Sequence, residues 1–163
     1  MKLLSALPAL VMVAAPLLAA DFAKGLSAYD KGDYAAALNE WRPLAEQGDA
    51  PSEFNLGLLY YDGHGVPQDY SEAARWFERS AEQGYTKAQH NLGAMYGAGK
   101  GVKRDYVQAY KWLSICAAAG DQGCESQRNL VEKKLSGSKL QTAQRMAREW
   151  KPATGSRAAD RSQ

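Results

Sequence analysis

Residues 47–84 read QGDAPSEFNLGLLYYDGHGVPQDYSEAARWFERSAEQG, and residues 83–120 read QGYTKAQHNLGAMYGAGKGVKRDYVQAYKWLSICAAAG. Aligned without a gap at a shift of 36 residues, the two stretches are identical at 15 of 38 positions. Repetition at a fixed spacing of this size is the sequence signature of repeat architectures, in which each copy is one supersecondary unit. The chain is therefore expected to be an array of such units.

A third, shortened copy lies upstream of these two. The residues that it shares with the next copy, each 36 positions apart, are Asp33, Tyr34, Ala37 and Ala45–Gly48. This copy lacks the Gly-x-Gly loop of the other two. Its first helix is expected near residues 22–30, before a tight turn at Lys31-Gly32.

Each full unit is expected to be a pair of antiparallel helices, called A and B. Helix A is predicted over 50–61 and 86–97, and helix B over 69–83 and 105–119. Each B segment opens with an aspartate, whose side chain can accept hydrogen bonds from the free N–H groups of the first turn. A glycine follows each B segment and can end the helix.

Small residues inside the helices indicate that the two helices of a unit approach closely. Gly57 and Gly93 occupy the same place in the two A segments, although glycine inside a helix costs about 1 kcal/mol relative to alanine. Trp76 and Trp112 recur in the B segments and are expected to fill the layers between helices.

The repeated pattern N-L-G-x-x-Y-x-x-G-x-G-V-x-x-D-Y-x-x-A-x-x-W resembles the Sel1-like repeat, a relative of the tetratricopeptide repeat. The resemblance covers roughly residues 33–120. It implies an all-α fold, an α/α solenoid wound as a right-handed superhelix with the A helices lining its concave face. It also implies an adaptor role, because the family is known mainly for adaptors with many different partners.

The pattern loosens after residue 120. A further A helix is predicted over 124–135 and a last helix over 140–150, with a cap at Ser138, and this pair is expected to close the solenoid. Residues 151–163 are rich in Gly, Ser, Ala and charge and are predicted to be disordered. The repeat domain is thus expected over 21–150, in units 21–48, 49–84, 85–120 and 121–150.

The chain has two cysteines, Cys116 and Cys124. An even count in an exported chain suggests a disulfide. Cys116 lies late in a helix B and Cys124 opens the next helix A, and the resemblance to cysteine-rich Sel1-like proteins implies a bridge between those helices. Such a bridge stabilises by about 2.5 kcal/mol in the chain-entropy model. The alternative is a redox or metal site, for which the sequence has no CxxC and no neighbouring histidine.

The N-terminus has the pattern of a secretory signal peptide over residues 1–20. Met1-Lys2 precedes an apolar run that ends in Ala19-Ala20. A membrane anchor is the alternative, but the run is shorter than the ~20 residues that a spanning helix needs, and Pro8 and Pro16 interrupt it. The mature chain is therefore expected to be periplasmic or secreted, without a membrane span.

Charge is unevenly distributed along the expected mature chain. Residues 21–121 contain 10 basic and 14 acidic residues, a net charge of −4, whereas residues 122–163 contain 9 basic and 4 acidic residues, a net charge of +5. A basic segment can attract nucleic acid. Its basic residues are spread out with no interleaved aromatic residues for base stacking, so no nucleic acid partner is expected.

No set of residues typical of an enzyme is evident. Ser136-Gly137-Ser138-Lys139 fits the S-x-x-K motif of penicillin-interacting enzymes, but the accompanying S-D-N and K-T-G elements are missing. His64 and His90, the only histidines, lack metal-ligand spacing. The sequence therefore predicts no catalytic residues, no cofactor and no metal.

A candidate binding surface follows from positions in helix A that differ between the two full repeats. They fall on one helical stripe and pair as Pro51/Lys87, Phe54/His90, Leu58/Ala94 and Tyr61/Gly97. The resemblance to tetratricopeptide units implies that this stripe lines the concave groove. The candidate groove residues are Pro51, Phe54, Leu58, Tyr61, Lys87, His90 and Ala94. The alternative is that the stripe packs against the shortened first unit.

These observations predict an exported scaffold that binds a protein or peptide of the cell envelope. The alternative function is binding or hydrolysis of a small envelope ligand, such as a peptidoglycan fragment or a β-lactam.

Overall fold

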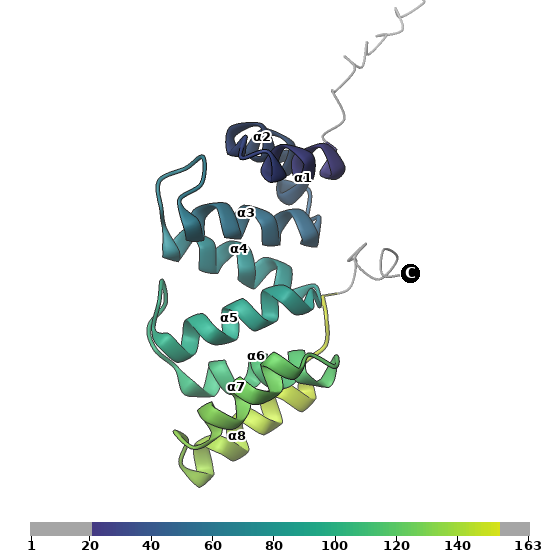
Figure 1. Cartoon of the computed structure of the whole chain (residues 1–163). Coiled ribbons are helices and arrows are strands. Elements are labelled where there is room, and N and C mark those ends of the chain that lie inside the picture. Colours follow the sequence, from purple (N-terminus) through teal and green to yellow (C-terminus); the bar gives the residue numbers. More distant parts are fainter. Residues whose placement is uncertain (1–20, 154–163) are drawn as a thin grey trace, which may run out of the picture.

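The computed structural model describes residues 21–153, which form eight helices and no strand. The helices are α1 (Phe22–Asp30), α2 (Tyr34–Glu46), α3 (Ala50–Asp62), α4 (Tyr70–Glu82), α5 (Thr86–Ala98), α6 (Tyr106–Ala118), α7 (Gln122–Glu132) and α8 (Gly137–Glu149). They stack in chain order into one elongated solenoid, as Figure 1 shows. The predicted all-α solenoid is confirmed. The signal peptide predicted over 1–20 lies outside the described residues.

The repeat pattern placed the helices of the two full units to within one or two residues. The A helices are α3 and α5, and the B helices are α4 and α6. Asp69 Oδ1 accepts hydrogen bonds from the backbone N–H groups of Ser71 and Glu72, and Asp105 caps α6 in the same way. Gly84 and Gly120 follow the B helices with φ values of +92° and +96°. Both predicted helix ends are therefore confirmed.

The glycines inside the A helices allow close packing. A Cβ atom on Gly57 would lie 2.7 Å from Phe77 Cδ1 in α4, and one on Gly93 would lie 2.7 Å from Leu113 Cγ in α6. A side chain at either position would collide with a large apolar residue of the partner helix, so glycine is required there.

The second glycine of each Gly-x-Gly loop contacts the unit before it. Gly65, with φ +72°, lies against the backbone of Tyr34 at the start of α2. Gly101, with φ +71°, lies against the backbone of Tyr70 at the start of α4. Each loop therefore reaches back over the first turn of the preceding B helix and sets how successive units stack.

The C-terminal helix departs from the repeat. Helix α8 packs on α6 and contacts α7 little, unlike the tightly paired helices of the full units. It begins at Gly137 with Ser136 as N-cap, so the predicted cap at Ser138 was wrong. Ser138 lies inside the first turn, where its carbonyl oxygen accepts a hydrogen bond from Thr142 Oγ1.

The chain after α8 runs back toward the end of α4 (Figure 1). Trp150 packs edge-on against Trp112 with ring centroids 6.0 Å apart. The backbone N–H of Ala153 donates to the carbonyl of Glu82 at 2.8 Å, using an acceptor that the end of α4 leaves free. The prediction of disorder was therefore wrong for residues 151–153, and residues 154–163 lie outside the described part.

Cys116 and Cys124 form the expected disulfide between α6 and α7, with Cα atoms 5.9 Å apart. Both cysteines are fully buried. No helix between residues 21 and 153 combines the length and the apolar character needed to cross a bilayer.

Candidate functional site

A groove runs along the exposed side of the A helices. It consists of a hollow of about 310 Å³ between α3 and α5 and a hollow of about 320 Å³ bounded by α5, α6 and α7, and the two share Ala94. We call this surface the A-helix groove. Its lining residues are Leu58, Tyr61, Asp62, Asn91, Gly93, Ala94, Met95, Gly97, Ala98, Lys100, Tyr106, Leu113, Gln127, Leu130, Val131 and Lys134.

Three of the seven predicted groove residues line this surface, namely Leu58, Tyr61 and Ala94. Phe54 does not, because it is only 8% exposed and packs against Phe77 and Tyr85, with ring centroids 5.6 and 5.3 Å away. The prediction that Phe54 lines a binding surface was therefore wrong.

The other three predicted residues lie outside the groove lining. Pro51 is half-buried in the first turn of α3, and Lys87 is exposed in the first turn of α5. His90 turns toward α7, where its Nε2 lies 3.0 Å from Gln127 Nε2. His90 also lies beside Cys116 and Cys124, although it is far from both along the sequence.

A cation is fixed at one edge of the groove. Lys100 Nζ donates to the Tyr61 hydroxyl at 3.0 Å and lies 4.4 and 4.1 Å from the ring centroids of Tyr61 and Tyr70. Hydrogen bonds to these two hydroxyls raise the pKa of the Lys100 ammonium above its ordinary value. Lys100 therefore remains charged at neutral pH in a position beside the apolar floor.

The sequence interpretation missed the contribution of α7. Leu130 lines the groove and is 63% exposed, which makes it the more exposed of the two large apolar side chains that lie open to solvent in the described range. Leu130 stands 36 residues after Ala94, which itself stands 36 residues after Leu58. The repeat spacing could thus have identified Leu130, although sequence identity between units fades after residue 120.

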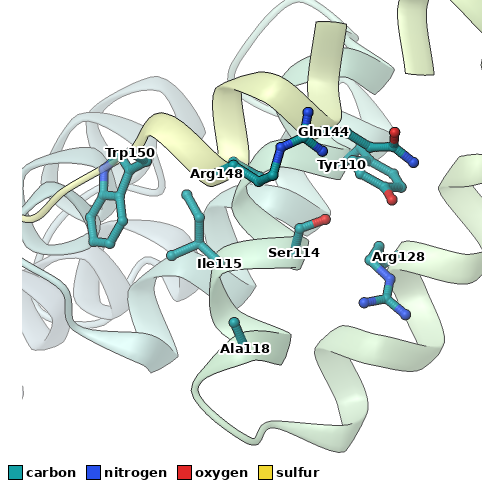
Figure 2. A pocket seen from close by; sticks show the side chains of 9 residues that line it. Tyr110, Ser114, Ile115, Ala118, Arg128, Gln144, Arg148 and Trp150 are labelled. Carbon is teal, nitrogen blue, oxygen red and sulfur yellow. The ribbon is translucent and has the colours of Figure 1, made fainter. Parts of the chain in front are cut away.

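A third hollow, of about 580 Å³, opens between α6, α7 and α8, because α8 diverges from α7. We call it the α6–α8 pocket. Figure 2 shows Arg148 of α8 and Arg128 of α7 on different sides of the pocket, with Ser114 of α6 between them. The Ser114 hydroxyl is buried and has no hydrogen-bond partner in the described chain. Ile115 and Trp150 form an apolar end.

The other residues considered for metal binding or catalysis either pack in the fold or lie on the surface. His64 stacks on Tyr34 with ring centroids 4.1 Å apart, which holds the first Gly-x-Gly loop against α2. Ser136 and Lys139 are exposed at the start of α8.

Comparison with known proteins agrees with this architecture. The family model described as Sel1 repeat matches residues 50–85 and 86–121. A crystal structure of a Sel1 repeat protein from Oxalobacter formigenes is 32% identical in sequence, with a TM-score of 0.61, and the alignment covers 66% of this chain and 84% of that one. The chain belongs to the Sel1 repeat family.

A second similar structure is a protective antigen of uropathogenic Escherichia coli strains, described as displaying an SLR fold. It is 34% identical to this Sel1 repeat protein with a TM-score of 0.73, and the alignment covers 77% of this chain but 28% of the antigen. This chain therefore corresponds to a little over a quarter of the antigen's length. A comparison with curated protein sequences found no match.

Proposed function

We propose that this Sel1 repeat protein is an exported scaffold that holds a protein or peptide of the cell envelope in the A-helix groove. The observation that carries the proposal is Leu130, which is 63% exposed on the groove surface. Burying an apolar side chain of this size against a partner is favourable, because it removes apolar surface from water. Sel1 repeat proteins are generally protein-interaction scaffolds, and this groove is where the chain offers such a surface.

The composition of the groove suits an extended peptide with apolar side chains. Leu58, Ala94 and Leu130 follow one another along α3, α5 and α7. Lys100 and Lys134 add cations to the apolar lining. An apolar centre with polar groups at the rim is the usual composition of a specific protein interface.

Export is supported by two features. The N-terminal residues have the pattern of a signal peptide. The Cys116–Cys124 disulfide is of a kind that persists in oxidising compartments and is rare in the bacterial cytosol.

Leu130→Asp is expected to weaken capture of the partner by about thirtyfold or more, the effect of losing one interface hot spot. Residues 21–163 would be immobilised in oxidised form and exposed to an envelope extract, and retained proteins would be identified by mass spectrometry. Leu26→Asp is the matched control, because Leu26 is also an exposed leucine, at 40%, but lies on α1 away from the groove. Equal retention by the Leu130→Asp and wild-type proteins would contradict the groove proposal.

A second candidate function is supported by the α6–α8 pocket, whose volume falls in the range of small-molecule sites. Arg148 and Arg128, the latter also paired with Glu125 at 3.5 Å, line the pocket with the unpartnered Ser114 hydroxyl and the apolar end formed by Trp150, a lining that suits a ligand carrying carboxylates. Peptidoglycan fragments carry carboxylates on their peptide stems. On this proposal the protein binds such a fragment without turnover.

Muropeptides are then expected to raise the melting temperature of the wild type, because a ligand that binds only the folded state stabilises it. The Arg128→Ala/Arg148→Ala variant should lose this shift. Arg145→Ala is the control, since Arg145 is an exposed arginine of α8 that does not line the pocket. A shift that persists in the double variant would place the ligand elsewhere.

A further inference from the structure

Four side chains that commonly bind metal ions meet at the junction of α5, α6 and α7. They are His90 of α5, Cys116 of α6, and Asp121 and Cys124 at the start of α7, and one donor atom from each lies within 4.8 Å of the others. We propose that, when the Cys116–Cys124 disulfide is reduced, these four side chains bind a zinc ion. The disulfide and the metal exclude each other, because only the thiolate form of cysteine is a metal ligand.

The donor set and its spacing fit zinc. Zinc prefers four ligands of nitrogen, sulfur and oxygen in a tetrahedron, and bonds of about 2.0–2.3 Å place those ligands about 3.3–3.8 Å apart. The present separations therefore need only small side-chain movements once the sulfur atoms are free. His90 and Asp121 are half-exposed, whereas both cysteines are buried. The two partly exposed ligands give an ion an entry path to the thiolates.

A neighbouring group holds one of the ligands in place, and another can orient a second. Asp121 Oδ1 accepts a hydrogen bond of 2.9 Å from the backbone N–H of Cys124, which holds the carboxylate beside that cysteine. His90 Nε2 contacts the Gln127 side-chain amide at 3.0 Å, and Nδ1 lies 3.7 Å from Asp121 Oδ1. The amide nitrogen of Gln127 faces Nε2 in the disulfide form. If Nδ1 is the ligand atom, Nε2 carries the proton, and a half-turn of the Gln127 amide lets its oxygen accept from Nε2–H, the kind of second contact that fixes metal-binding histidines.

A glycine leaves space for this arrangement. A Cβ atom on Gly123 would lie 3.0 Å from His90 Cε1 and 3.1 Å from Asp121 Oδ1. Any larger residue at position 123 would therefore press on both ligands.

The fold itself does not require these four residues. The corresponding positions 36 residues earlier are Phe54, Ser80, Tyr85 and Ala88. There the junction is closed by the packing of Phe54 on Tyr85 and by a hydrogen bond from Ser80 Oγ to the Ala50 carbonyl. The same helix geometry is thus built without a metal-binding group. At the next junction Asp121 also caps α7 and the two cysteines form the disulfide, whereas the packing of the helices does not require a histidine at position 90 beside them.

Reduction of the Cys116–Cys124 disulfide before zinc binding can be carried out with a phosphine. The phosphine gives two electrons to the S–S bond and takes the oxygen atom of water to become a phosphine oxide, and the two protons of that water pass to the sulfur atoms. Zinc then displaces the two thiol protons as it binds. The zinc ion itself is neither oxidised nor reduced.

The test uses the full chain and cobalt(II) as a spectroscopic probe for zinc. After phosphine treatment and confirmation of two free thiols by titration, cobalt is expected to produce a thiolate-to-cobalt absorption band at one ion per chain, which zinc abolishes. The oxidised chain should give no band. His90→Phe, which restores the residue of the preceding repeat, and Asp121→Asn should each weaken binding at least tenfold. Glu125→Gln, an exposed carboxylate next to Cys124, is the control and should bind normally.

Absence of the band in the reduced chain, or unchanged binding by both ligand variants, would overturn the proposal. Circular dichroism of the reduced chain shows whether reduction itself lowers the helix content. If reduction lowers the helix content, zinc is expected to restore it in the wild type but not in His90→Phe, because binding and folding are then coupled. Failure of zinc to restore helix content would also overturn the proposal.

Discussion

Arg79→Ala is expected to lower the free energy of unfolding at pH 7 by about 3 kcal/mol, the lower end of the range for breaking a buried ion pair. Arg79 Nη2 lies 2.9 Å from Oε1 of Glu53, a carboxylate that is only 1% exposed. The substitution would leave this carboxylate without its counterion. The lower end applies because Arg79 is itself 46% exposed, so water already screens part of the attraction. Denaturant unfolding followed by circular dichroism measures the change.

The effect of Arg79→Ala should depend on pH in a defined direction. Burial raises the pKa of the Glu53 carboxyl, and Arg79 opposes this shift. Removing Arg79 raises the pKa further, so the folded variant holds the Glu53 proton more tightly than the unfolded chain does. The contribution of Glu53 to the stability of the variant is then greatest in acid and falls as pH rises from the unfolded pKa of Glu53 through its folded value. The destabilisation should therefore be smaller near pH 4 than at pH 7.

Glu53→Gln provides the control for this pair. Combined with Arg79→Ala, it removes the unpaired charge while keeping an acceptor for the Gln83 side chain, which donates to Glu53 at 2.6 Å. The double variant should recover part of the lost stability and lack the extra loss between pH 4 and pH 7. A single Arg79→Ala variant with the same deficit at both pH values would show that packing, and not the buried charge, dominates.

Gly101→Ala is expected to destabilise the protein by about 4 kcal/mol. Position 101 has φ +71°, which costs a residue with a side chain about 1–3 kcal/mol. In addition, the new Cβ atom would press against the backbone carbonyl of Tyr70, and an overpacked contact of this kind costs about 1–3 kcal/mol. Because a backbone carbonyl cannot move aside like a side chain, the two costs should add.

Gly32→Ala separates these two contributions. Gly32 also has a positive φ, +76°, but a Cβ atom there would meet nothing within 4 Å. This variant should lose only about 1–3 kcal/mol, the cost of the backbone conformation alone. Equal losses in thermal or denaturant unfolding of the two variants would mean that the contact between the Gly-x-Gly loop and the preceding unit is not tight.

The local rules of helix formation account for what could be predicted about the fold. Asp69 caps α4 and Gly84 ends it, and both act within a few residues of their own position in the chain. Because the pattern repeats every 36 residues, a helix assigned in one unit is also expected at the same place in the next. Prediction became less accurate at α8, where Ser136 and not Ser138 is the N-cap, because the repeat no longer supplied a second copy for comparison.

The candidate site was predicted less well than the fold. The stripe of varying positions in helix A included Leu58 and Tyr61, which line the groove, but also Phe54, which lies in the core. Helical spacing identifies residues that share a face of one helix. It does not say where the next helix covers that face, and the burial of Phe54 depends on Phe77 of α4 and on Tyr85, which precedes α5.

The sequence by itself determined the helix pairs, their length, their caps and the glycines that let them touch, because each depends on a local or a repeated pattern. The tertiary structure alone decided that α8 leaves α7 and opens the α6–α8 pocket, that Ala153 returns to Glu82, and that His90 meets the two cysteines. These contacts join residues from different units, and they depend on the angles at which whole helices pack. No spacing within the chain encodes those angles.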